Sequence, residues 1–408
     1  MLTDPDADLG VTKSTVALEP GIADLGIADK AAWRSVVATA ISAERTIRYS
    51  VIETDKTFAH DGPLASVIRG VAGTVLVVID SAVWRIAAKE IGAYLAEATT
   101  SHRIVVLPGG EQNKTLKRAL EIVDAMDQSN TPRRSAPVIA IGGGVICDLV
   151  GFAASIYRRG VPYFRVPTTL LSQVDVSVAI KTGVNRGGYR NRIGAFWPAE
   201  LTLIDRSFLS SQSRVEISHG LGEVFKLALI KSEPLFGQLE RIPHGWSPEW
   251  LSIDESAAKL MRLAIEEMAV ELRADLWEDD LARCVDFGHS FSPLIEMRNG
   301  IHHGHAVALD CLLSLCIAIN RGLINRQYLD RAVAVMLRCA LPTGHVDFAN
   351  IELLWESLQE TVKHRDGHQH LPMPTGLGRY VFVEDLTCDE LGPAVRLMAS
   401  ATTKATDD

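Results

Sequence analysis

The chain has 408 residues, 47% of them hydrophobic and 22% charged, and this length predicts two domains rather than one core. Its net charge of −9 excludes a general nucleic-acid-binding protein, because no excess of cations is present to neutralise phosphates. The six cysteines form no C-x-x-C pair and no run approaches the roughly 18 apolar residues of a membrane helix, so we expect a cytoplasmic protein with free thiols and no membrane contact.

The first half of the chain alternates short apolar runs with helical patterns. Residues 1–29 are polar and acidic, and we expect a flexible arm there. Strands are predicted at 46–53, 71–80 and 102–108, helices at 81–98 and 114–128, and a strand, glycine turn and helix at 137–157. Elements that alternate in this way predict a mostly parallel sheet with helices on both faces. We therefore assign residues 30–200 to a Rossmann-like α/β domain.

The second half has a different character. Helical spacing dominates after about residue 205, at 219–232, 255–276, 304–323 and 329–340, and strand signals nearly vanish. We therefore expect an all-α domain over residues 201–398, followed by a flexible tail at 399–408.

Residues 139–152, IAIGGGVICDLVGF, hold three glycines between a strand and a helix. Such glycines let the backbone approach a ligand closely and direct helix N-terminal amides at its phosphates. Taken alone, a glycine turn after a strand is more often only a tight turn. Here Asp80 ends an earlier strand, where it can accept hydrogen bonds from a ribose, and Glu111 and Lys114 lie on a second loop. These segments meet at the carboxyl ends of the strands, which predicts a dinucleotide site.

Residues 157–196 concentrate arginine and lysine among amide and hydroxyl side chains on turn-rich backbone. Cations interleaved with such donors suit a phosphate monoester. Basic runs of this kind most often form solvent-exposed loops. However, apolar residues surround Asp175 and Lys181 in VDVSVAIK, which indicates that both side chains are partly buried. Burial of a charge costs free energy unless a partner or ligand compensates it. We interpret this segment as a pocket.

Four of the twelve histidines lie in residues 286–310, among small and apolar residues. A few satisfied core or surface histidines would be the ordinary explanation, and a metal site is the alternative. His303 and His305 are two residues apart on a predicted helix, so at most one of them binds a given ion. Glu223, in an apolar helix with Lys226 on the same face, is a candidate carboxylate. A glutamate and two histidines from three segments would form a catalytic zinc site with an open position.

With these segments in place, the sequence resembles the sugar phosphate cyclase family, whose best-known member is 3-dehydroquinate synthase. The matching motifs run in order between about residues 45 and 395: GGGVICDLVGF, PTTLLSQVDVSVAIKTGVN, NRIGAF, GEVFK, DFGHSFSP and HHGHAV. The resemblance implies a dehydroquinate synthase-like fold, usually in a homodimer, with NAD in the α/β domain and Zn²⁺ or Co²⁺ in the helical domain. It implies Glu223, His289 and His303 as metal ligands, and leaves His302 and His305 beside or outside the site.

The resemblance also implies roles for further residues. The group that would hold NAD comprises Asp80, Glu111, Lys114, Gly143, Gly144, Val145, Asp148, Thr168, Thr169, Lys181 and Arg190. The group that would bind the sugar phosphate comprises Arg159, Asp175, Asn191 and Leu272. The catalytic group comprises Lys181, Lys226, Asp286 and His364.

The mechanism of the family would use each of these groups. NAD transiently oxidises a secondary hydroxyl of a sugar phosphate, and the metal polarises the oxygen. Phosphate then leaves by β-elimination, the hydride returns, the ring opens, and an intramolecular aldol reaction closes a carbocycle. NAD is regenerated in each cycle.

Departures from the dehydroquinate synthase pattern N-x-G-H-T-x-G-H indicate a branch of the family. Asp286 replaces the asparagine, Pro293 replaces the second histidine, and Arg190 stands where lysine is usual. An anionic Asp286 would repel a carboxylate substrate and suits a neutral polyol. The motif resembles the branch acting on sedoheptulose 7-phosphate, and Leu272, Asp286 and His364 together are similar to the 2-epi-5-epi-valiolone synthases within it.

Other functions stay open at this point. Another sugar phosphate cyclase would give 2-epi-valiolone, demethyl-4-deoxygadusol or 3-dehydroquinate. A metal-dependent polyol dehydrogenase of related fold would accumulate NADH. A non-catalytic NAD-binding protein is disfavoured, because Glu223, His289, His303, Lys181 and Lys226 are all present.

Overall fold

The computed structural model describes residues 46–280 and 282–407, so the arm expected at residues 1–29 lies outside the described residues. Arg48–Asp408 form one compact unit. A division into two domains between residues 200 and 201 therefore stays a prediction. The large sheet extends past that boundary through Leu201–Ile204, and most of the helices follow it.

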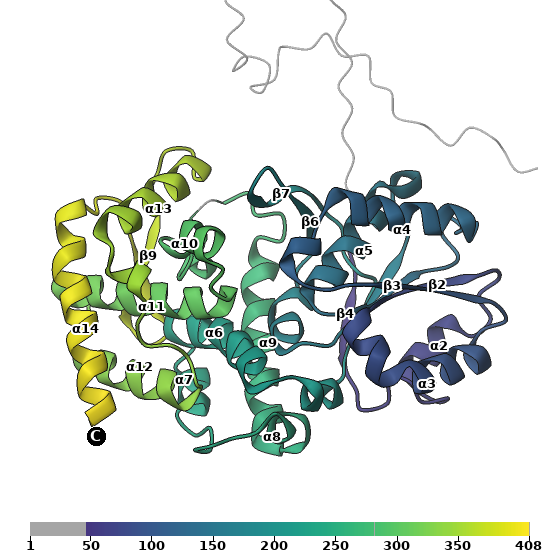
Figure 1. Ribbon diagram of the computed structural model, residues 1–408, viewed down its shortest axis with the longest axis horizontal. Helices are drawn as coiled ribbons and strands as arrows, with labels where there is room; N and C mark the ends of the chain where they lie inside the picture. The colour runs from purple at the N-terminus through teal and green to yellow at the C-terminus, as the bar shows by residue number, and fades with distance from the viewer. Residues whose placement is uncertain (1–45, 281, 408) are drawn as a thin grey trace, which may run out of the picture. The chain divides into compact units, whose positions relative to one another are not determined.

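A six-stranded sheet organises the first half (Figure 1). Its strand order is β1-β8-β5-β4-β2-β3, and every neighbouring pair is parallel. The strands are β1 (Ser50–Glu53), β2 (Val75–Asp80), β3 (His102–Leu107), β4 (Val138–Gly142), β5 (Tyr163–Pro167) and β8 (Leu201–Ile204). The predicted parallel α/β architecture is confirmed.

Helices cover both faces of this sheet because successive strand residues point to opposite sides. Leu76 and Val78 of β2 pack with α4 and α5, whereas Val77 and Ile79 pack with α2 and α3. Figure 1 shows these two helix pairs on opposite sides of β2 and β3. The helices are α2 (Pro63–Ile68), α3 (Ser81–Ala98), α4 (Leu116–Gln128) and α5 (Gly144–Ile156).

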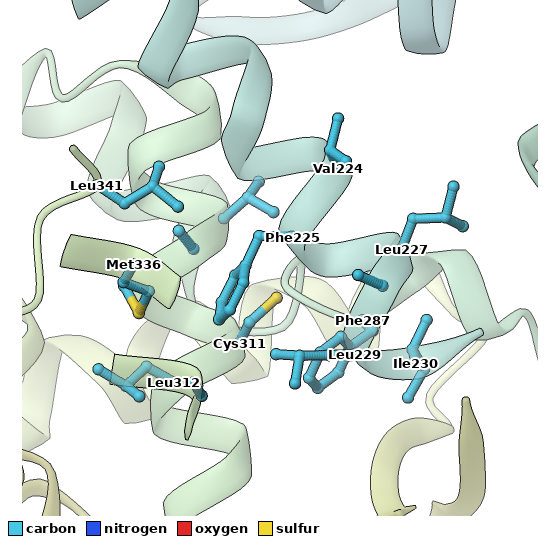
Figure 2. Close-up of a cluster of buried hydrophobic side chains, with 14 of the residues drawn as sticks. Val224, Phe225, Leu227, Leu229, Ile230, Phe287, Cys311, Leu312, Met336 and Leu341 are labelled. Atoms are coloured by element: carbon cyan, nitrogen blue, oxygen red, sulfur yellow. The ribbon is translucent and has the colours of Figure 1, made fainter. Parts of the chain in front are cut away.

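The second half packs helices around the buried helix α11 (Figure 1). Its helices are α6 (Arg214–Ile230), α7 (Glu233–Leu239), α8 (Pro248–Ile253), α9 (Glu255–Ala274), α10 (Ser292–Asn299), α11 (His303–Asn320), α12 (Gln327–Arg338), α13 (Ile351–His364) and α14 (Leu391–Asp407). Figure 2 shows how Phe225 and Leu229 of α6 lie near Cys311 and Leu312 of α11, with Met336 of α12 beside them. Burial of these apolar side chains fixes the pairing of α6 with α11.

Helix α11 alone among the described helices is long and apolar enough for a membrane span, with a mean hydropathy of 1.3 over 18 residues. However, 78% of that stretch is buried against the rest of the protein. This is the pattern of a core helix.

Two hairpins depart from the expected elements. β6 (Lys181–Arg186) and β7 (Tyr189–Phe196) form an antiparallel pair, as do β9 (Leu371–Gly376) and β10 (Arg379–Val383). The expectation of an all-α second half is thus wrong in this detail. Two prolines in β9 conceal the strand from sequence analysis, and they are tolerated because this sheet has only two strands. At the end of the chain, α14 makes the expected tail helical as far as Asp407.

Candidate functional site

The carboxyl ends of β2, β4 and β5 bring several of the expected cofactor residues to one edge of the sheet. Gly142 ends β4 beside Pro167 of β5, and its carbonyl oxygen accepts a hydrogen bond from Thr168 N at 3.0 Å. A Cβ added to Gly142 would lie 2.8 Å from Ile146 Cβ and 3.1 Å from Asp80 Cβ. Only glycine fits this close approach, which places Asp80 directly against the turn.

Helix α5 begins at the glycine turn. Gly143 precedes it without a side-chain cap, and Gly144 and Val145 form its first turn. A Cβ on Gly143 would lie 3.1 Å from Thr169 Cγ2, so Thr169 faces the same turn. Uncapped amides at a helix N-terminus, together with the helix dipole, are suited to a pyrophosphate.

The second loop is linked to this helix by Lys114. The buried Lys114 Nζ lies 2.5 Å from Asp148 Oδ2 of α5, and it donates a hydrogen bond to Asn191 Oδ1 at 2.5 Å. Asn191, which the resemblance assigned to the sugar phosphate, therefore lies with the cofactor group in this structure.

Glu111 and Arg190 pair on the same side of the molecule. Glu111 Oε1 accepts hydrogen bonds from Asn185 Nδ2 at 2.7 Å and from Arg190 Nε at 3.0 Å. Burial acts to raise the pKa of Glu111, but the hydrogen bond and charge of Arg190 outweigh it and lower the pKa to about 2. Glu111 is therefore a fixed anion.

Glu223, His289 and His303 converge from three segments of the helical half. Each offers one ligand atom, and these atoms all lie within 4.8 Å of one another. Glu223 comes from α6, His289 from the turn before α10, and His303 from the first turn of α11. Glu223 Oε1 lies 3.1 Å from His303 Nε2 and 3.7 Å from His289 Nε2. Among the described residues, no other group of this kind is present.

The partners of the two Nδ1 atoms fit a metal site. His289 Nδ1 lies 3.2 Å from the Phe287 carbonyl oxygen, and His303 Nδ1 lies 2.9 Å from Glu296 Oε1. Both partners only accept, so each Nδ1 carries a proton, and Nε2 is the ring atom of each histidine that can bind a metal ion. The donor Arg190 Nη1 also lies 3.3 Å from His303 Nδ1. Such outer partners are usual for histidines that bind zinc.

The carboxylate of Glu223 also fits a metal. Its side chain is 2% exposed, yet neither oxygen has a hydrogen bond of good geometry, although Lys226 Nζ lies 2.6 Å from Oε2. A buried carboxylate left in this state costs free energy unless a cation binds it. One carboxylate and two imidazoles are a common donor set for catalytic zinc.

Lys226 and Asp175 surround this carboxylate with further charge. Burial acts to lower the pKa of Lys226, but the charges of Glu223 and Asp175 outweigh it and raise the pKa. Burial and the charge of Glu223 raise the pKa of Asp175, which lies on the π-helical turn Ser172–Val176. The site thus combines a cationic amine with a carboxyl group that holds its proton more readily than usual.

A glycine next to each of the three candidate ligands allows the close packing. A Cβ on Gly222 would lie 2.0 Å from the carbonyl oxygen of Gly304, and one on Gly304 would lie 1.8 Å from that of His219. Gly288, before His289, has a φ of +78°, and a Cβ there would lie 2.8 Å from Cys311 Sγ. Contact between the backbones of α6 and α11 therefore sets the distance between Glu223 and His303.

We expect Gly304→Ala to weaken both folding and zinc binding. The new methyl group forces α6 and α11 apart, which should lower the free energy of unfolding by about 1–3 kcal/mol. Urea unfolding measures this loss, and competition with a chromophoric chelator measures zinc affinity. Gly92→Ala in α3 is the matched control, because nothing lies within 4 Å of its Cβ position. Equal behaviour of the two variants would contradict the account.

Asp286 lies beside the metal group but is paired with two arginines. Arg283 Nη2 donates to Asp286 Oδ1 at 2.8 Å, and Arg365 Nη2 lies 3.3 Å from Oδ2. The anion is therefore compensated, which corrects the expectation that its bare charge repels a carboxylate substrate. Its effect on specificity would act through the placement of these two guanidinium groups.

Lys181 reaches the same network through Glu278. Lys181 Nζ lies 2.6 Å from Glu278 Oε1, and Glu278 also contacts Arg283. Lys181 is about half exposed, with 54% of its side chain accessible. A phosphate that binds Lys181 would have to compete with this carboxylate.

Three of the expected residues make no polar contact with the metal group. His364 is exposed at the end of α13, Leu272 packs in the apolar core of α9, and Arg159 is exposed with a φ of +61°. Among the described residues, none of them forms a hydrogen bond or ion pair with Glu223, His289 or His303. Their proposed roles rest on the resemblance alone.

Sequence reasoning missed Glu296 and Arg365. Glu296 holds His303, and Arg365, directly after His364, is buried and contacts Asp286. Glu296 lies in a short helix with polar and apolar residues, so no local pattern identifies it as a partner of a metal ligand. His302 is exposed, and His305 Nε2 lies 3.2 Å from Ser218 Oγ, so both lie outside the metal group.

Comparison with known proteins identifies relatives of the whole described chain. The family models for the 3-dehydroquinate synthase N-terminal and C-terminal regions match residues 104–219 and 220–364. A 2-epi-5-epi-valiolone synthase from Streptomyces hygroscopicus subsp. jinggangensis is 40% identical over 94% of each chain. A demethyl-4-deoxygadusol synthase from Trichormus variabilis is 34% identical over 86% of this chain and 87% of its own length.

A solved structure is also similar. It is ValA, the 2-epi-5-epi-valiolone synthase of Streptomyces hygroscopicus subsp. jinggangensis, with NAD⁺ and Zn²⁺ bound. It superposes with a TM-score of 0.83 at 39% identity, over 89% of this chain and 99% of that one.

Proposed function

This chain belongs to the 3-dehydroquinate synthase family of sugar phosphate cyclases, and from that premise we propose that it is a 2-epi-5-epi-valiolone synthase. It would cyclise sedoheptulose 7-phosphate and release inorganic phosphate. The observation that carries the proposal is the convergence of Glu223, His289 and His303, with both carboxylate oxygens of Glu223 buried and without a hydrogen bond of good geometry. The 40% identity to an enzyme of that name over 94% of the chain supports the choice of product.

We propose that Glu223, His289 and His303 hold Zn²⁺ and that the glycine turn, with Asp80, Glu111, Thr168 and Thr169, holds NAD⁺. When bound, NAD⁺ would accept a hydride and later return it, while the zinc ion would polarise the reacting oxygen. The chain is an enzyme of a family with NAD⁺- and Zn²⁺-bound members such as ValA. Homodimeric assembly and cytoplasmic location stay predictions.

The residues of this chain would bind and orient the sugar phosphate. The buried Lys226 ammonium can donate hydrogen bonds to ring hydroxyls, and Asp175 can hold a proton for transfer at its carboxyl group. Lys181 would pair with the phosphate in exchange for Glu278. Because the Lys181 side chain is half exposed, the phosphate that it binds can leave to solvent after elimination.

A substrate panel tests the proposal. Purified protein with NAD⁺ and Zn²⁺ should release phosphate from sedoheptulose 7-phosphate but not from the heptulosonate substrate of 3-dehydroquinate synthase. NMR of the carbocycle should show 2-epi-5-epi-valiolone, and absorbance should show no net NADH. Release from the carboxylate substrate, an epimeric product or accumulation of NADH would each contradict it.

We expect Asp286→Asn to fold normally but to lower kcat/KM by about 10-fold or more, or to change the product. The amide leaves Arg365 without its carboxylate partner and leaves Arg283 paired with Glu278 alone. Steady-state phosphate release and product NMR measure the effect. An unchanged rate with an unchanged product would reject a role for Asp286.

A further inference from the structure

A continuous chain of polar contacts joins the cofactor loop to the metal group. It runs from Asn185 to Glu111, from Glu111 to Arg190, from Arg190 to Glu296, and from Glu296 to His303. We propose that Glu296 positions His303 as a metal ligand, and that Arg190, by binding Glu296 and Glu111 together, couples dinucleotide binding to metal binding. The coupling rests on the proposed function, because it requires NAD⁺ at the Glu111 loop.

The contact between Glu296 and His303 is the first step. His303 Nδ1 lies 2.9 Å from Oε1 and 3.0 Å from Oε2 of Glu296, and Glu296 is 8% exposed. The carboxylate therefore holds the Nδ1 proton and the ring plane, and it leaves Nε2 3.1 Å from Glu223 Oε1. Loss of such a partner typically weakens metal binding about 10–100-fold.

Arg190 supplies the second step. Its Nε donates to Glu111 Oε1 at 3.0 Å, and its Nη1 donates to Glu296 Oε2 and lies 3.3 Å from His303 Nδ1. One rigid guanidinium on β7 thus binds a carboxylate from each half of the molecule. A lysine at this position would offer a single point charge and could not hold both carboxylates in a fixed geometry.

The consequence is a reciprocal effect between the two ligands. A dinucleotide that fixes Glu111 also fixes Arg190, and through Glu296 it fixes the ring of His303. Zinc binding costs less conformational entropy when the ring of His303 is already oriented. NAD⁺ should therefore tighten zinc binding, and zinc should tighten NAD⁺ binding by the same factor, expected at about 5-fold or more.

The experiment measures zinc affinity by competition with a chromophoric chelator, with and without NAD⁺. Five full-length proteins are compared: wild type, Glu296→Ala, Glu296→Gln, Arg190→Ala and the control Arg298→Ala. Arg298 lies on α10 with Glu296 but pairs with Glu356 at the surface, where both side chains are about half exposed. Circular dichroism and thermal unfolding establish that each variant is folded.

The variants separate the two steps. Glu296→Ala should bind zinc about 10–100-fold more weakly than wild type. Glu296→Gln keeps an oxygen that accepts from Nδ1 but loses the charge that binds Arg190. It should therefore restore most of the zinc affinity and yet lose the effect of NAD⁺, as should Arg190→Ala. Arg298→Ala should match wild type in both measurements.

Each outcome decides the proposal. Wild-type zinc affinity in Glu296→Ala would overturn the positioning role. A surviving NAD⁺ effect in Arg190→Ala would overturn the coupling, and one in Glu296→Gln would overturn its passage through Glu296. Zinc binding by the wild type that is indifferent to NAD⁺ would also overturn the coupling while it leaves the proposed function standing. A wild type that binds no zinc would reject the proposed function and this inference with it.

Discussion

Glu223→Ala should lose its bound zinc and nearly all turnover while it stays folded. The variant removes the only carboxylate of the metal group and leaves Lys226 buried without its nearest anion. We expect zinc affinity to fall by more than about 100-fold, because Glu223 would bind the metal directly rather than hold one of its ligands, and kcat/KM to fall by about 10³-fold or more. Inductively coupled plasma mass spectrometry after dialysis gives the metal content.

The control for this prediction is Glu266→Ala, which removes an exposed glutamate from α9. It should retain one zinc ion per chain and wild-type turnover. Full metal occupancy in Glu223→Ala would contradict the assignment of Glu223 as a ligand, whatever the activity.

Asp310→Ala should cause a large loss of stability. Asp310 of α11 is fully buried, and its Oδ2 accepts hydrogen bonds from the backbone amides of Ser290, Phe291 and Ser292 at 2.6–2.9 Å. These residues connect His289 to α10. The variant leaves three buried amides unsatisfied, so the free energy of unfolding should fall by about 3–5 kcal/mol. Asp61→Ala, at an exposed aspartate, should stay within about 0.5 kcal/mol of wild type in urea unfolding.

Asp310→Asn should be milder, because its amide oxygen still accepts these hydrogen bonds, and its effect should depend on pH. Burial raises the pKa of Asp310 from 3.8 to about 6, so the folded protein holds this proton more tightly than the unfolded chain. That contribution to stability is complete below pH 3.8 and is lost as the pH rises through about 6. The variant lacks it, so from about pH 4 to about pH 7 its stability should rise relative to wild type. A difference that stays constant with pH would contradict this.

Local patterns were sufficient for β1 to β4 and for the glycine turn, but they did not reveal β5, β8 or the β6–β7 hairpin. The β-branched run of β2, the glycines after β4 and the helical period of α5 are properties of adjacent residues, so the parallel sheet and its ligand-binding edge follow from them. The same reasoning failed at β9, where Pro372 and Pro374 conceal a strand that only pairs with β10.

The metal group shows where such reasoning ends. Spacing alone could not choose among His302, His303 and His305, and only the resemblance pointed to His303. The structure supplies the physical reason, since the contact between Gly222 and Gly304 brings His303 against Glu223. The sequence did not indicate site roles for Glu296 and Arg365, because each contacts a residue on another segment of the chain. Their partners are set by how α10 and the end of α13 pack, and packing at long range leaves no local signal.

The most direct test of the central claim is a crystal structure of the protein with Zn²⁺ and NAD⁺, with anomalous data collected at the zinc edge. We predict one strong anomalous peak bound by Glu223 Oε, His289 Nε2 and His303 Nε2, with the nicotinamide ring in the same cavity. A peak on other ligands, or a dinucleotide in a separate cavity, would contradict the account.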